Sequence, residues 1–255
     1  MGAAGAPVTS GGGSSRRATG SVESPARLQA LKVSWERASR LSPRDAVVTG
    51  DTSEADAPPA PPTSVEARAA DPLLAKPLFV FVRDDPALCD GKCGGACQRA
   101  YDLDEGVFAQ EKVALALRAF RTITMTRAEA EAEPVLGSGA EGEWPRLLIV
   151  DVARASVTAL AGSDVTASRV YREMAKAVSR FYMERLDALV KGHQRILKEH
   201  DRLAQEEALL HEQKVLTTDE RRAKDLDERL GEVDAARRDL ERKTERLWTL
   251  TPREL

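Results

Sequence analysis

Residues 73–82 of this 255-residue chain read LLAKPLFVFV. Within this stretch, residues 78–82 are all aromatic, β-branched or leucine, with no polar side chain among them. Such a run is typical of a strand that is buried on both faces of a sheet. We therefore expect a central strand here, with a globular domain built around it.

On the C-terminal side of this strand, the pattern alternates between helix and strand. In each segment, apolar residues either recur at helical spacing or alternate with polar ones. The expected elements are a helix over residues 107–120, strands over 121–126, 147–150 and 156–160, and a helix over 165–182. An acidic, glycine-containing loop is expected over residues 127–143. The order β-α-β followed by β-β-α predicts an α/β domain over residues 71–182.

Residues 1–70 differ in composition from the expected domain. They contain a Gly/Ser tract at 11–15 and a Pro/Ala tract at 57–62, and they have few large apolar side chains. We expect a disordered tail, because such a segment buries too little surface to offset the entropy of ordering it. Residues 26–41 are an exception, since their leucines and Trp35 fit a short helix that would dock on the next domain.

Residues 183–250 are rich in charges of both signs, and large apolar residues recur every seven positions. This spacing is typical of helices that pack along a seam. One heptad series ends at Leu210 and a second, out of phase, begins at Leu226, while Thr217 and Glu220 between them have the spacing of a capping box. Two architectures remain open, an antiparallel helical hairpin and one continuous coiled-coil rod. Residues 251–255 form a short tail.

All three cysteines of the chain lie within nine residues, in the loop that follows the first strand. A thiolate near a helix N-terminus is stabilised by the helix dipole, and Lys92 or Arg99 would lower its pKa further. Two neighbouring thiols can then form and break a disulfide by exchange. We expect Cys93 and Cys97 to be the redox-active pair and Cys89 to be auxiliary, with Cys89 and Cys93 nearly as favoured.

The cysteine spacing leaves two other interpretations open. One is a set of inert thiols, because a permanent disulfide is unusual in the cytosol. The other is metal binding, which is less favoured because a structural zinc site takes four ligands and three cysteines would need Asp90 or a histidine as the fourth. Residues 98–192 contain no histidine, and His193 and His200 fit polar positions of the helix seam. We therefore expect no metal site and no cofactor.

Three stretches, taken in order, resemble the thioredoxin-like families that include thiol:disulfide interchange domains. They are LLAKPLFVFV (73–82), VFAQEKVALALRAFRTITM (107–125) and EWPRLLIVDVARASVTALAG (143–162). The resemblance implies a thioredoxin-like fold, in which a Cys-x-x-Cys pair at the start of the first helix faces a cis-proline. It therefore implies that Pro145 follows a cis peptide bond and faces the cysteine loop, with Trp144 covering that loop. The cysteines here are spaced x3 and x3, so the family motif itself is absent.

Composition limits the function classes. A formal net charge of −3 disfavours a general nucleic-acid or polybasic membrane binder. No apolar run approaches the roughly 18 residues of a membrane span, and no secretory signal is recognisable, so we expect a cytoplasmic protein. Phosphate-binding, dinucleotide-binding and hydrolase motifs are missing from the sequence.

Two hypotheses about function follow. The first is a thioredoxin-like thiol–disulfide oxidoreductase or redox sensor that uses the Cys-x3-Cys-x3-Cys loop. In it, residues 183–250 would bind a partner protein or drive self-association. The second is a non-catalytic thioredoxin-like adaptor, and a metal-binding protein is a weaker third. The sequence alone leaves open whether the protein is an enzyme.

Overall fold

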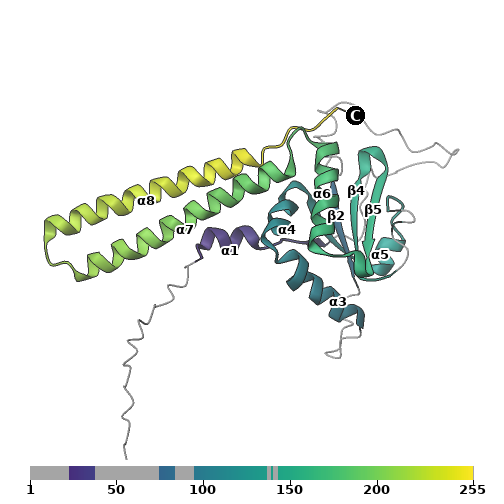
Figure 1. The fold of residues 1–255 in the computed structure, drawn as a ribbon, viewed down its shortest axis with the longest axis horizontal. Helices are drawn as coiled ribbons and strands as arrows, with labels where there is room; N and C mark the ends of the chain where they lie inside the picture. Colours follow the sequence, from purple (N-terminus) through teal and green to yellow (C-terminus); the bar gives the residue numbers. More distant parts are fainter. Residues whose placement is uncertain (1–22, 38–74, 84–94, 137–138, 140–142, 255) are drawn as a thin grey trace, which may run out of the picture.

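The computed structural model describes residues 23–37, 75–83, 95–136, 139 and 143–254. In this part of the chain a five-stranded sheet carries helices on both faces, and a long helical pair projects from it (Figure 1). The strands lie in the order β1-β3-β2-β4-β5. Their bounds are Glu36–Arg37 (β1), Leu78–Arg83 (β2), Arg121–Thr126 (β3), Arg146–Asp151 (β4) and Ser156–Ala161 (β5).

β2 is the middle strand of the sheet, as the apolar run predicts. It pairs with β3 in parallel and with β4 in antiparallel orientation, and its residues 78–82 are at most 1% exposed. Because side chains alternate along a strand, Phe79 and Phe81 enter one core while Val80 and Val82 enter the other. The predicted double burial is confirmed.

The two faces of the sheet are covered unequally (Figure 1). The larger core includes side chains of α4 (Glu111–Ala116) and α6 (Ala167–Phe181), together with Phe108, whose ring lies 5.3 Å from that of Phe81. The smaller core, on the other face, is closed by the single-turn helix α5 (Arg127–Glu131) and by Leu136. This second face therefore has the thinner cover among the described residues.

The charged C-terminal segment forms an antiparallel hairpin, not one continuous rod (Figure 1). α7 (Leu186–Leu216) ends at residue 216, and α8 (Glu220–Leu247) begins where the Asp219 carboxylate accepts hydrogen bonds from two backbone N–H groups. α8 starts within the expected stretch 217–220, but the capping box expected from Thr217 and Glu220 is wrong, because Asp219 caps α8 and Thr217 ends α7. The buried seam consists of the heptad residues Leu203, Leu210, Leu226, Val233 and Leu240.

Two helices appear where the sequence predicted loops. α3 (Gly95–Leu103) begins well before residue 107, and α5 lies inside the expected loop over 127–143. α3 is largely polar and exposed, so apolar spacing does not reveal it. α5 depends on a capping box, in which Thr126 and Glu129 each accept a backbone hydrogen bond from the other residue.

Part of the expected tail belongs to the fold. The helix expected over residues 26–41 is the shorter α1 (Pro25–Leu31), and the chain after it forms the edge strand β1. The other residues of the expected tail, 1–22 and 38–70, lie outside the described residues.

A polar network holds α1 against two other helices. The Asp201 carboxylate of α7 accepts hydrogen bonds from the backbone and hydroxyl of Ser24 and from Arg27, at 2.8 to 3.0 Å. Arg27 also pairs with Glu111 of α4. Burial alone would raise the pKa of Asp201, but the hydrogen bonds from Ser24 and Arg27 outweigh this effect and lower it.

His193 of α7 lies at the junction between the hairpin and the sheet domain. It is 1% exposed, and its Nδ1 accepts a hydrogen bond from the indole N–H of Trp248 at 3.0 Å. Burial, helped by the nearby positive charge of Arg118, lowers the pKa of His193 to about 4. The ring is therefore neutral near pH 7, as a hydrogen-bond acceptor must be.

We predict that acidification lowers the free energy of unfolding less in the His193→Gln variant than in the parent protein. Between pH 6.5 and 4 the unfolded chain protonates His193 and the native state does not, so the free energy of unfolding falls as the pH drops. The loss amounts to about 2 to 3 kcal/mol at most. Urea denaturation at pH 7 and at pH 4 measures it, with the exposed His211→Gln on the same helix as control. Equal pH slopes in all three proteins would contradict the prediction.

Candidate functional site

The candidate site lies at the C-terminal end of the central strand β2, beside the N-terminal end of β4. These strands are antiparallel, and Val82 of β2 is paired with Arg146 of β4. The segment that leaves β2 toward the cysteines therefore starts beside Pro145, which directly precedes β4. An antiparallel register of this kind brings two loops together although they are some 60 residues apart in sequence.

Cys97 lies in the first turn of α3 and is half-buried. It is disulfide-bonded in this structure, and the other two cysteines, Cys89 and Cys93, lie outside the described residues. The first turn of α3 contains no acidic residue that would oppose the positive end of the helix dipole. The position therefore suits a thiolate in the reduced protein.

The Trp144–Pro145 peptide bond is cis, which confirms that part of the expectation. Arg99, two residues after Cys97, donates hydrogen bonds from Nε and Nη2 to the carbonyl oxygen of Trp144, at 3.3 and 3.0 Å. The cysteine-bearing turn is thus tied to the residue that precedes the cis-proline.

The guanidinium of Arg99 also lies beside the start of its own helix. A Cβ placed on Gly95 would be 3.3 Å from Arg99 Nη1, so the side chain folds back toward the first turn. A fixed positive charge near a thiol favours the thiolate. Arg99 is predictable from the sequence as a cation near the thiols, but its contact with the Trp144 carbonyl leaves no signal there, because every residue has such a carbonyl.

Trp144 itself forms part of the smaller core. Its side chain is 8% exposed, and the guanidinium of Arg127 lies 5.6 Å from the ring centroid. The indole therefore packs between α5 and the sheet. Its cation–π contact with Arg127 contributes about 1 kcal/mol.

The far end of α3 is also held to β2. After α3, residues 104–108 form a wide helical turn that contains Asp104, and its carboxylate lies 3.6 Å from the guanidinium of Arg83, the last residue of β2. Burial raises the pKa of Asp104, and Arg83 opposes that shift. α3 is thus anchored at Trp144 by Arg99 and at β2 by the turn that follows it.

The histidines do not take part in this site. His193 and His200 are buried along α7, and His211 is exposed on the same helix, 4.0 Å from Glu207. Within the described ranges, no group of three histidine, cysteine or carboxylate residues is arranged to hold a metal ion. In the same ranges, no helix is long and apolar enough to cross a membrane.

Comparison with known proteins adds no assignment. No protein-family model, no curated protein and no solved structure matches this chain significantly.

We predict that Arg99→Gln raises the pKa of the Cys97 thiol by about half a unit, because a neighbouring positive charge is lost. The measurement is the pH dependence of Cys97 alkylation in a Cys89→Ser, Cys93→Ser background, in which only one thiol remains. Arg99→Lys should keep most of the effect, and Arg180→Ala, exposed at the end of α6, should change nothing. Identical alkylation profiles for Arg99→Gln and the parent would refute the role of Arg99.

Proposed function

We propose that this chain is a thioredoxin-like thiol–disulfide oxidoreductase or redox sensor. Cys93 is the favoured partner of Cys97, and Cys89 is auxiliary. The fold assignment is supported by the strand order β1-β3-β2-β4-β5, in which β4 alone runs antiparallel to the other strands. This topology agrees with the β-α-β, β-β-α order on which the sequence resemblance rests.

The observation that carries the proposal is the contact between Arg99 and the Trp144 carbonyl. It joins the turn that contains Cys97 to a cis-proline from a distant part of the chain. A disulfide substrate that lies along residues 144–145 would therefore meet the sulfur of Cys97 or of its partner.

The chemistry needs only the two thiols and a substrate disulfide. One cysteine thiolate attacks a substrate sulfur, the substrate S–S bond breaks, and the released substrate thiolate takes up a proton. The second cysteine, as its thiolate, then attacks the mixed disulfide, forms the internal disulfide and releases the second substrate thiol. Two electrons pass from the protein dithiol to the substrate, and a dithiol donor restores the reduced protein.

We predict that the protein accelerates reduction of insulin disulfides by dithiothreitol, and that Cys97→Ser and Cys93→Ser each abolish the acceleration. Cys89→Ser should retain most of it. The readout is the turbidity of the released insulin chain, with thermal unfolding of each variant as the control for folding. Activity that survives in the Cys97→Ser variant would exclude the proposed pair.

A second candidate function, a non-catalytic adaptor, is favoured by the far end of the hairpin. Leu209, Val215 and Leu216 are 58%, 85% and 76% exposed there, which is unusual for large apolar side chains. Alkylation and intact mass across a glutathione redox series separate the two functions. Two thiols that convert reversibly support the oxidoreductase, and three thiols that stay free at every potential support the adaptor.

A further inference from the structure

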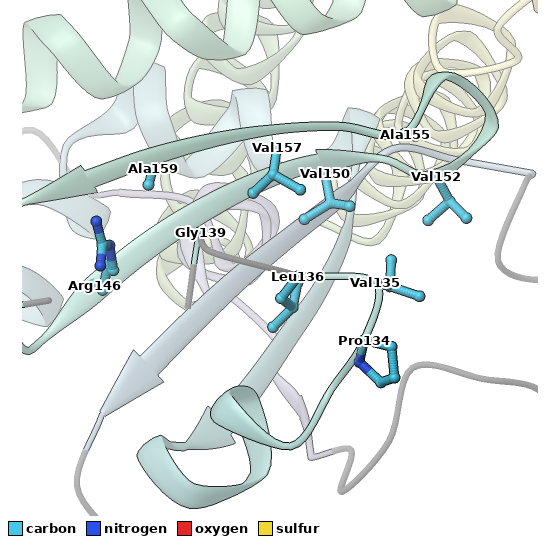
Figure 2. Close-up of a pocket in the computed structure, with 10 residues that line it drawn as sticks. All are labelled: Pro134, Val135, Leu136, Gly139, Arg146, Val150, Val152, Ala155, Val157 and Ala159. Atoms are coloured by element: carbon cyan, nitrogen blue, oxygen red, sulfur yellow. The ribbon is translucent and has the colours of Figure 1, made fainter. Parts of the chain in front are cut away.

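A cleft of about 720 Å³ opens on the thinly covered face of the sheet. It lies between the segment around Leu136 and the β4–β5 hairpin, as Figure 2 shows. Arg146 stands at one end and Val152 at the other, with Val150 and Val157 between them. The volume falls within the range of about 300 to 1,000 Å³ that is usual for small-molecule sites.

Among the described residues that line the cleft, the side chains are aliphatic except for Arg146, while backbone groups contribute polar surface. These lining residues are otherwise alanine, glycine, leucine, proline or valine. Several of these side chains, including Val152, Val157 and Ala159, are only partly buried, so they present apolar surface to the cleft. A molecule with a hydrocarbon body would remove that surface from water.

Arg146 is the one charged residue among the described residues of the lining. Its Nε and Nη1 atoms are buried, and neither has a hydrogen-bond partner among the described residues. Guanidinium N–H groups that are removed from water without an acceptor destabilise the folded protein. Such groups call for an explanation, and an acceptor carried by a ligand provides one.

We propose that this cleft binds a small monocarboxylate with an aliphatic body. The carboxylate accepts hydrogen bonds from the guanidinium of Arg146, and the hydrocarbon body packs on Val152, Val157 and Ala159, which are partly buried. The single cation among the described lining residues matches one negative charge, whereas a phosphate usually finds further donors. The other described lining residues have aliphatic side chains, which favours an aliphatic body over a ring or a sugar.

This site is separate from the proposed thiol chemistry. The binding requires no cysteine and no electron transfer, so it can be measured with the proposed redox function intact or absent. Its ligand is defined by the charge at one end of the cleft and by the apolar walls.

The test is a calorimetric titration of the full-length protein with sodium octanoate. We expect saturable 1:1 binding, with octanol and octylamine at least tenfold weaker because they lack the carboxylate. Acetate, which has the carboxylate without the hydrocarbon body, should show no detectable binding. Octanol that binds as tightly as octanoate, or octanoate that does not saturate, would overturn the proposal.

Two variants separate loss of the site from loss of the fold. Arg146→Met should weaken octanoate binding at least tenfold, while the melting temperature without ligand stays the same or rises, because a buried guanidinium without a partner is removed. Ala159→Leu keeps Arg146 but fills the cleft, and should weaken octanoate binding to a similar degree. Unchanged octanoate affinity in a folded Arg146→Met protein would also overturn the proposal.

Discussion

The apolar residues of β2 hydrogen-bond to β3 on one side and to β4 on the other, and their side chains divide between the two cores. This double burial requires cover on both faces of the sheet. β3 runs parallel to β2, so the connection between them has to cross a face of the sheet, and its helices supply part of that cover. β4 and β5 then complete the sheet as an antiparallel hairpin. The larger core follows from Phe79 and Phe81, whose rings require the cover that α4 and α6 supply.

The same register creates the candidate site. Because Val82 is paired with Arg146, the C-terminal end of β2 lies beside the N-terminal end of β4. Arg99 ties the cysteine turn to the residue before the cis-proline, through hydrogen bonds to a backbone carbonyl. Alternation along β4 then sends the side chain of Arg146 to the face that carries the aliphatic cleft, while Leu147 enters the larger core. The candidate thiol site and the proposed carboxylate site therefore share one short segment.

Strands β2 to β5 and the two long helices could be predicted from the sequence because their apolar residues follow a clear period, whereas the period left open whether these helices form a hairpin or a rod. α3 could not, since its buried surface is little more than Ala100, and neither could the two-residue strand β1. Within the site, the position of Cys97 and the cis bond before Pro145 came from the family resemblance. The Arg99 contact and the role of Arg146 escaped prediction for one physical reason. Both depend on which groups lie near a guanidinium in space. The partner of Arg99 is a backbone carbonyl, which every residue has, and the missing partner of Arg146 leaves no pattern in the sequence.

The hairpin belongs to the sheet domain along only half of its length. Leu186, Val190 and Leu197 of α7 are part of the larger core, whereas the seam from Leu203 onward forms a cluster of its own. Near the domain, Gly192 allows close packing, because a Cβ there would lie 3.1 Å from Leu247 of α8. Beyond it, the two helices hold each other through the seam and through ion pairs such as Arg237 with Glu207. The distal half therefore contributes little to the stability of the sheet. Packing against the sheet does not constrain its surface residues, which include the exposed Val215 and Leu216.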